Sequence, residues 1–359
     1  MEKNDFTDIF DYKIELHVHL DGSVRSETVL DIANQRGLQI HLPHRTVEEL
    51  KRDIVITKPC SLSKLLESFG YFMPIIAGSR EAVYRIAYEF CEDSAKEKTK
   101  YVEVRYCPHL LANSLEKRDF ALERGNYTPR DVVLTVNEAL EAGSRDFNIS
   151  AKSILCCMTH RPELSEEVAH LCNEFRAQGV VGIDIAGEEF VPGTEPDECL
   201  HKQAFSYAKK NEIHRTVHAG ENGPASAVRE ALDHMHAERI GHGYHALDDL
   251  ELYQRILRDK VHLEICPISS IRTKACPEDI KQHPLLRLVA DGANYSINTD
   301  DPIVLDNDLI DDYRFVSQMG LSNQQIIQGI FNAARSCFAP ENEKKQILKD
   351  LVTVYGNNF

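Results

Sequence analysis

Residues 13–22 read KIELHVHLDG, a short apolar run that ends in two histidines, an aspartate and a glycine. The run is typical of a buried β-strand, predicted here over 13–20. Side chains two residues apart on a strand share a face, so we expect the rings of His17 and His19 to point the same way. A strand with reactive residues at its carboxyl end is typical of a parallel sheet that carries a site there.

The rest of the chain repeats this pattern of a short strand followed by a helical segment. Helices are predicted over 79–98, 130–147, 322–335 and 341–353, and another begins at Pro224. Eight such units indicate a closed (β/α)8 TIM barrel with extra helices inserted after strand 1 and at the C-terminus. We expect residues 1–359 to form one domain. Besides 13–20, the predicted strands are 101–106, 152–158, 180–187, 214–219, 239–243, 261–267 and 294–300.

The composition limits the partners and the compartment. The chain has 359 residues, 42% hydrophobic and 27% charged, as in an ordinary globular protein. A net charge of −16 argues against nucleic acid and anionic membranes as partners, because both bind proteins through an excess of Lys and Arg side chains. No apolar run approaches the roughly 18 residues of a membrane span, and we expect no secretory leader. Ten scattered cysteines favour a reducing, cytoplasmic setting.

Reactive side chains lie at the ends of three of the predicted strands. His17 and His19 end the first strand, His218 the fifth, and Asp300 the eighth. The carboxyl ends of barrel strands meet at one rim, so these side chains are expected to converge. Three imidazoles and one carboxylate, with a position left open for water, favour zinc. The alternative, in which His17 and His19 are satisfied core histidines, does not explain the polar residues around them.

Two other metal chemistries fit the sequence less well. Cytidine-deaminase-type enzymes need Pro-Cys-x-x-Cys after His-x-Glu, and the chain has no such motif. Binuclear amidohydrolases bridge their metals with a lysine on strand four, and no lysine lies between Arg176 and Lys202. A mononuclear centre, with one Zn²⁺ per chain, is favoured.

Three more residues of the rim are candidates for proton transfer. Glu221 follows His218 on a glycine-flanked turn, where a desolvated carboxyl would have a raised pKa and suit a general acid. It can alternatively be a helix-start charge ahead of Pro224. His242 and Asp301 are candidates for orienting water, or for supporting the metal ligands.

The motifs together resemble the adenosine deaminase family, whose animal members convert adenosine and 2′-deoxyadenosine to the corresponding inosines. The resemblance covers nearly the whole chain. It rests on residues 15–22, 101–106, 153–158, 184–187, 214–221, 241–245 and 298–302.

The resemblance implies a role for each matching position. Zinc would lie on His17, His19, His218 and Asp300. Glu221 would protonate purine N1 as hydroxide adds to C6, while His242 holds the hydroxide and helps to deprotonate it. The remaining implied substrate contacts are Asp301 to the attacking oxygen and purine N7, the Gly187 amide to N3, and Asp21 with His19 to the ribose 5′-hydroxyl.

An apolar gate over the pocket is also implied, formed by Leu62, Leu65, Leu66 and Phe69. At helical spacing these four can instead be a core-facing stripe. Asp21 would accept a hydroxyl but repel a 5′-phosphate, so we expect a purine nucleoside rather than AMP as the substrate. Relatives of the same fold act on AMP, N6-methyl-AMP or adenine, and these are the alternative substrates.

A partner surface and an internal ion pair are the last expectations. Animal relatives attach to a cell-surface peptidase through a helix that corresponds to 130–147, where Glu138, Glu141 and Arg145 are contacts or plain solvated charges. Such a partner would add a minor extracellular pool to a monomeric cytoplasmic enzyme. Glu103 and Arg105 share a strand face and are expected to pair inside the barrel.

Overall fold

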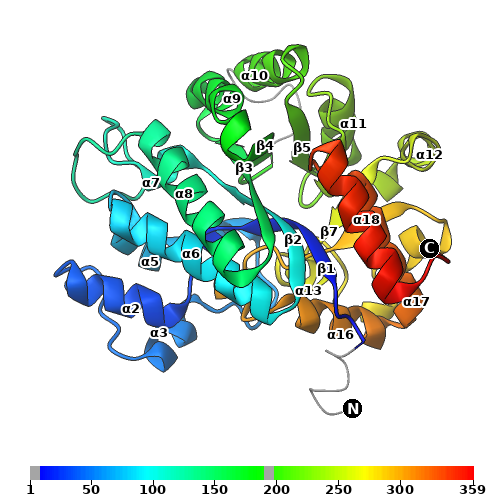
Figure 1. Cartoon of the computed structure of the whole chain (residues 1–359), viewed down its shortest axis with the longest axis horizontal. Helices are drawn as coiled ribbons and strands as arrows, with labels where there is room; N and C mark the ends of the chain where they lie inside the picture. The colour runs from blue at the N-terminus through cyan, green and yellow to red at the C-terminus, as the bar shows by residue number, and fades with distance from the viewer. Residues whose placement is uncertain (1–8, 190–197) are drawn as a thin grey trace.

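A computed structural model describes residues 9–189 and 198–359 of the chain. Eight parallel strands form one sheet in the order β1 to β8, surrounded by helices (Figure 1). This confirms the predicted (β/α)8 barrel. The strands are β1 (Lys13–His19), β2 (Thr99–Tyr106), β3 (Ser150–Met158), β4 (Val180–Ala186), β5 (His214–Ala219), β6 (Arg239–His242), β7 (His262–Ile265) and β8 (Asn294–Ile297).

The last strand is shorter than the predicted 294–300, and the reason lies where the barrel closes. Asp300 has φ 73°, in the left-handed region, so the chain leaves the extended conformation before it. A single bridge between Val18 and Asp300 then joins the two edges of the sheet. The amide of His19 donates to the carbonyl of Asp300 at 2.9 Å, which ties the carboxyl ends of β1 and β8 together.

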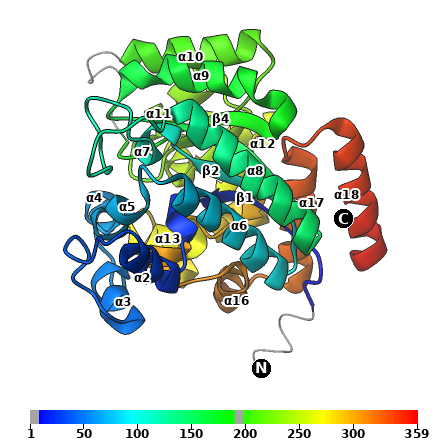
Figure 2. The same ribbon diagram turned by 60° about the vertical axis from the view of Figure 1, so that its left-hand side comes forward.

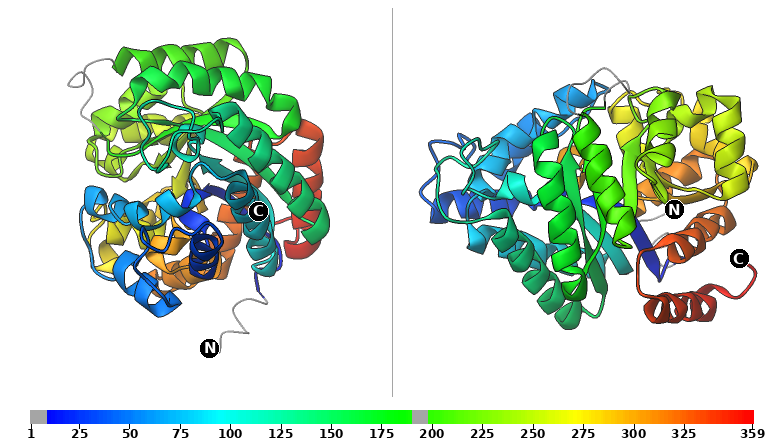
Figure 3. Two further views of the ribbon diagram at one scale, coloured as in Figure 1. Left: turned by 90° about the vertical axis from the view of Figure 1, so that its left-hand side faces the viewer. Right: turned by 90° about the horizontal axis from the view of Figure 1, so that it is seen from above.

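The helices follow the predicted plan, with five of them, α2 to α6, inserted between β1 and β2. These inserted helices and the carboxyl-terminal pair α17 and α18 lie on opposite sides of the barrel (Figures 1 and 3). Figure 2 shows the inserted helices from the side, with α4 and α5 beside one another. Among the described residues, no helix combines the length and apolarity needed to cross a bilayer.

Four of the helices before β3, α3, α4, α6 and α8, begin at a residue whose side chain caps the helix. Thr128 forms a capping box with Asp131 at the start of α8. The first nine described α-helices are α2 (Ser26–Gln35), α3 (Val47–Ile54), α4 (Leu62–Leu66), α5 (Phe69–Ile76), α6 (Arg80–Lys96), α7 (Pro108–Leu111), α8 (Pro129–Phe147), α9 (Ser165–Glu174) and α10 (Glu198–Lys210). The others are α11 (Ala225–Asp233), α12 (Leu250–Asp259), α13 (Pro267–Arg272), α14 (Pro284–Ala290), α15 (Pro302–Leu305), α16 (Leu309–Met319), α17 (Asn323–Ser336) and α18 (Glu341–Tyr355).

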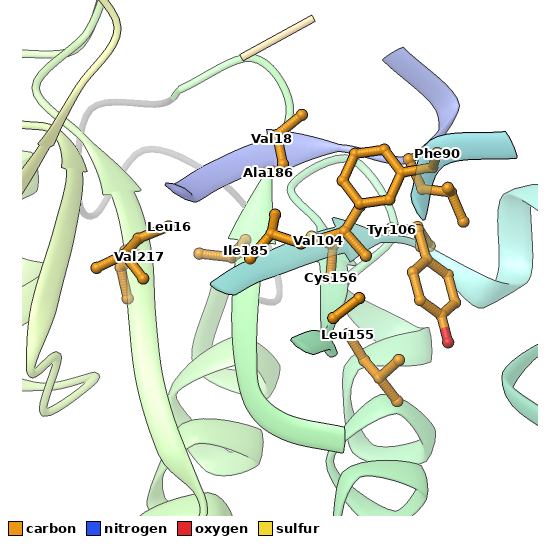
Figure 4. Close-up of a cluster of buried hydrophobic side chains, with 14 of the residues drawn as sticks. Leu16, Val18, Phe90, Val104, Tyr106, Leu155, Cys156, Ile185, Ala186 and Val217 are labelled. Carbon is orange, nitrogen blue, oxygen red and sulfur yellow. The ribbon is translucent and has the colours of Figure 1, made fainter. Parts of the chain in front are cut away.

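Apolar strand residues pack between the sheet and the helices around it. Val104 and Tyr106 of β2 lie near Phe90 of α6, and Leu155 of β3 and Ile185 of β4 continue the same cluster (Figure 4). Each of these side chains is at most 5% exposed. Burial of this kind is the main term that stabilises the barrel, at about 25 cal/mol per Å² of apolar area.

The expected ion pair between Glu103 and Arg105 does not form. Arg105 instead reaches across the barrel to Asp184 at 2.6 Å and Glu264 at 2.8 Å, while Glu103 pairs with Arg239 at 2.6 Å. All five side chains are essentially inaccessible. A same-strand pair would have left the buried carboxylates of Asp184 and Glu264 without the Arg105 cation, which is strongly unfavourable.

Candidate active site

A cavity of about 710 Å³ opens at the carboxyl ends of the strands. The strand ends and the loops that follow them supply its reactive side chains, as expected for a barrel of this type. The sequence-predicted residues that line it are His19, Asp21, Leu62, Leu66, Phe69, Gly187, His218, Glu221, His242, Asp300 and Asp301. His17 is completely buried beneath this rim, and Leu65, at 1% exposure, packs in the hydrophobic core instead of lining the cavity.

Nitrogen and carboxylate atoms gather tightly at the base of the cavity. Candidate ligand atoms of His17, His218, His242 and Asp300 lie within 4.8 Å of one another, and those of His19, Asp300 and Asp301 form a second such group. Asp300 Oδ1 is 3.2 Å from His17 Nε2 and 3.4 Å from His19 Nε2. A tetrahedral zinc ion with bonds of about 2.0–2.1 Å to nitrogen holds its donors about 3.3 Å apart.

Hydrogen bonds to carboxylates orient two of these histidines. Glu264 lies 2.8 Å from Nδ1 of His17, and Asp184 lies 3.1 Å from Nδ1 of His218. A proton held on Nδ1 leaves the Nε2 lone pair facing the cluster, and Nε2 of His17 has no hydrogen-bond partner. A buried, unpartnered nitrogen of this kind fits a metal ligand.

The two supporting carboxylates are held ionised by the cation beneath them. Although burial opposes it, the hydrogen bond from His218 and the Arg105 cation lower the pKa of Asp184. Arg105 and Arg239 likewise outweigh burial and hold the pKa of Glu264 well below its usual range. Ionised carboxylates accept the imidazole Nδ1 protons, so the whole arrangement favours metal-binding tautomers.

His19 and His242 are alternative candidates for the fourth metal ligand of the cluster, beside His17, His218 and Asp300. His19 Nε2 lies 3.2 Å from His218 Nε2, at a separation typical of two ligands of one ion. His242 Nε2 is farther from Asp300, at 3.9 Å, and lies 3.5 Å from Glu221 Oε2. His19 therefore has the shorter contacts with the other ligand atoms, whereas His242 belongs to the four-residue group and also lies next to Glu221.

The backbone is strained at two of these positions. His242 and Asp300 both adopt positive φ, at 65° and 73°, which non-glycine residues rarely do. Strain of about 1–3 kcal/mol per residue persists where the surrounding structure fixes the conformation, typically at functional sites.

Glu221 is a buried acid aimed at the cavity. Its carboxyl is 5% exposed and its Oε1 has no hydrogen-bond partner. Burial, and then the negative charges of Asp300 and Glu189, raise the pKa of Glu221 well above its usual range. A raised pKa of this kind suits a carboxyl that acts as a proton donor.

The cavity has distinct polar groups at its other edges. Asp21 is 6% exposed, and burial raises the pKa of its carboxyl to about 6. Its Oδ1 has no partner, and neither has Oδ1 of Asp301. Gly22 has to be glycine because a Cβ there would lie 2.9 Å from Cα of Asp301. Gly187, with φ 112°, follows the last residue of β4 at the cavity wall.

Comparison with known proteins places this site in a family. The model of the family described as adenosine deaminase matches residues 12–354. The chain belongs to the adenosine deaminase family. Two adenosine deaminases, from Danio rerio and Bos taurus, are each 48% identical to it; both alignments cover 96% of this chain, and 95% and 94% of the relatives. The chain is therefore a hydrolytic deaminase.

Solved structures share the deaminase barrel at lower identity. An adenine deaminase from Arthrobacter aurescens has a TM-score of 0.80 at 25% identity, covering 95% of this chain and 98% of the other. The N6-mAMP deaminase of Arabidopsis also has a TM-score of 0.80, at 26% identity, covering 98% and 99%. The fold is thus common to deaminases with differently named substrates, and the pocket has to distinguish them.

Sequence reasoning missed the supports of this deaminase site. Asp184 and Glu264 orient imidazoles, and Ser269 donates to Asp300 Oδ2 at 2.7 Å. Glu189 accepts from the turn that carries Glu221. Asp184 and Glu264 could have been found as carboxylates inside otherwise apolar strands, whereas Ser269 and Glu189 lie on a helix and a loop with no local signal.

Proposed function

We propose that the chain removes the C6 amino group of adenosine and 2′-deoxyadenosine, adding water and releasing the corresponding inosine and ammonia. The observation that carries this is Glu221, a buried proton donor whose Oε2 lies 3.5 Å from His242, beside a cluster of imidazoles and a carboxylate. Close relatives named adenosine deaminase support the substrate. We further propose that one domain carries the whole reaction, in purine metabolism.

We assign the metal of this site as one zinc ion per chain, held by His17, His19, His218 and Asp300. The separations of 3.2–3.4 Å among their ligand atoms and the unpartnered Nε2 of His17 support this set. When bound, zinc lowers the pKa of water from 15.7 to about 7 and so supplies a nucleophile at neutral pH.

The chain's own residues perform the proton transfers. Glu221 donates its proton to purine N1, which makes C6 electrophilic, and His242 accepts a proton from the attacking water. The proton on His242 then passes to the C6 amine, which leaves as ammonia, and the proton of the new C6 hydroxyl returns to Glu221 as the carbonyl forms. Asp301, through its unpartnered oxygen, orients that water and contacts N7. The amide of Gly187 binds N3, and Leu62, Leu66 and Phe69 cover the purine and limit its access to solvent.

The closed end of the pocket favours a nucleoside over a nucleotide. The Asp21 carboxyl is buried there without a partner for Oδ1, and it is mostly ionised at neutral pH because its pKa is about 6. It accepts the 5′-hydroxyl of adenosine, with His19 beside it, but repels the phosphate of AMP or N6-methyl-AMP. Adenine, which has no ribose, leaves Asp21 unused.

A chelation experiment tests the reaction and its metal together. Purified chain is mixed with adenosine, and the loss of adenosine absorbance is followed before and after treatment with a chelator and after zinc is added back. We expect activity that chelator abolishes and zinc restores. Parallel assays with AMP, N6-methyl-AMP and adenine should be slower, and faster turnover of any of them would overturn the substrate assignment.

We also make proposals about a partner-binding surface on α8 and about the cellular compartment of the protein. Arg145 is 71% exposed and Glu141 is exposed, whereas Glu138 already pairs with Arg80 at 2.8 Å. We propose a monomeric cytoplasmic enzyme whose α8 can also bind a cell-surface peptidase, with a minor extracellular pool. Pull-down of such a peptidase by the wild-type chain but not by Arg145→Glu would support the contact, and equal recovery would contradict it.

A further inference from the structure

The turn that carries Glu221 is wrapped around another carboxylate. Glu189, on the loop after β4, accepts hydrogen bonds from three successive backbone amides. Gly220 donates to Oε2 at 2.7 Å, and Glu221 and Asn222 donate to Oε1 at 2.7 and 3.1 Å. Successive amides that converge in this way form an anion-binding nest, here filled by a side chain of the same molecule.

The sequence of the turn is fitted to this carboxylate. Gly220 has φ 72°, which lets the amides of the turn point inward together. A Cβ at Gly223 would clash with Oε2 of Glu189 and lie 3.1 Å from its Cδ, so glycine leaves the room that the carboxylate occupies. The close approach of Glu189 therefore explains Gly223, whereas Gly220 is explained by its positive φ and by Val228, which a Cβ would meet.

We propose that Glu189 is a positioning residue for Glu221: its carboxylate fixes the backbone of the turn so that the acid is aimed at purine N1. This inference rests on the proposed function. Glu189 also lines the cavity, but both of its carboxylate oxygens accept hydrogen bonds from the turn, so it acts through the amide of Glu221. Gly187, proposed above to bind N3, lies only two residues before it, so one short loop carries both the N3 amide and the residue that positions the N1 acid.

A double-mutant cycle tests this. Glu189→Gln replaces one acceptor oxygen with an NH₂ donor that opposes the turn amides, so kcat should fall on the order of tenfold to a hundredfold with a small change in KM. If Glu189 acts through Glu221, adding Glu189→Gln to Glu221→Gln should lower kcat less than threefold further, roughly, because the acid is already absent. Metal content should be unchanged in each variant.

A second variant disturbs the nest without removing a charge. Gly223→Ala places a Cβ against the carboxylate and should reproduce the loss of kcat. Gly70→Ala is the matched control, because a Cβ at Gly70 meets nothing within 4 Å, and it should leave kcat unchanged.

The outcomes separate this inference from the proposed function. Wild-type kcat in Glu189→Gln, or equal losses in the presence and absence of the Glu221 carboxyl, would overturn the positioning role. Lower metal content in Glu189→Gln and Gly223→Ala would overturn it too, since the effect would then come from the metal centre. If the wild-type chain does not deaminate adenosine at all, it is the proposed function that fails.

Discussion

The barrel holds two layers of buried charged side chains, and they differ in how their polar atoms are satisfied. In the lower layer, Arg105 and Arg239 bridge the carboxylates of Asp184, Glu264 and Glu103 at 2.6–2.8 Å. In the upper layer, at the rim, atoms of His17, Asp21, Glu221, His242 and Asp301 have no partner. Both layers are inaccessible or nearly so, so burial does not distinguish them.

This difference separates the buried side chains that stabilise the site from those that are available to bind a ligand. The lower layer also has two atoms without partners, Arg105 Nε and Arg239 Nη2, but each guanidinium makes other charged contacts. The unpartnered atoms of the upper layer are mostly acceptors or titratable groups around a cavity, and a metal ion, water and a purine can satisfy them. A buried group left without a partner costs about 1–3 kcal/mol, which marks the rim as the place where a ligand is expected.

The largest effect should follow a change in the upper layer. Glu221→Gln keeps the size of the side chain but removes the proton that it donates, so kcat should fall by about 10²–10⁴. Metal content and the midpoint of thermal unfolding should be close to those of the wild type. Steady-state kinetics with metal analysis measures this, and an unchanged kcat would remove Glu221 from the reaction.

A change in the lower layer should act first on stability. Arg105→Met leaves Asp184 and Glu264 buried without the cation between them, and should lower the free energy of unfolding by about 3–5 kcal/mol. Denaturant unfolding of the metal-free protein measures it. Lys51→Met, which breaks the exposed pair with Asp306, is the control and should change stability by at most about 1 kcal/mol. A similar small effect in both variants would contradict the contrast between the layers.

A third variant tests the contact between the layers. Asp184→Asn keeps an acceptor for His218 Nδ1 but removes the charge that favours its metal-binding tautomer, so zinc affinity should fall about 10- to 100-fold. Competition with a chelator of known affinity measures this. Asp300→Ala should bind zinc more weakly still, because it loses a ligand. Full zinc occupancy of Asp300→Ala under the same competition would contradict the ligand set.

The two layers also show what the sequence could predict. The strand–helix alternation was sufficient to predict the barrel, because the periodicity of hydrophobic residues indicates local secondary structure directly. The rim residues were found because parallel strands share one end, so strand order need not be known to expect convergence. The partners of Arg105 could not be found in this way. They lie on β4 and β7, and only the barrel's curvature and register bring them within 3 Å.

The apolar gate and Glu189 show a second limit of what can be predicted from the sequence. Leu62, Leu65, Leu66 and Phe69 have the spacing of one helical face, yet Leu65 packs in the core while the other three line the cavity. Leu62, Leu65 and Leu66 all lie in α4, so periodicity cannot report which side chains of one helical turn face the cavity and which face the core. Glu189 lies 32 residues from the amide of Glu221 to which it is bonded, and nothing in either segment alone indicates the contact.

The smallest effect is a pH dependence at the ribose end of the rim. Burial raises the pKa of Asp21 to about 6, so the carboxylate that we propose as the acceptor of the 5′-hydroxyl is present above pH 6 and is lost as the pH falls through that value. At pH 5 about a tenth of it remains ionised, and KM for adenosine should rise about three- to tenfold relative to pH 7.5. Asp21→Asn should have a raised KM that no longer responds to pH over this range. Two results would contradict this: a wild-type KM that does not change between pH 5 and 7.5, or an Asp21→Asn variant with the same pH profile as the wild type. Either result would mean that other groups bind the 5′-hydroxyl. The discrimination between adenosine and AMP would then have a different source.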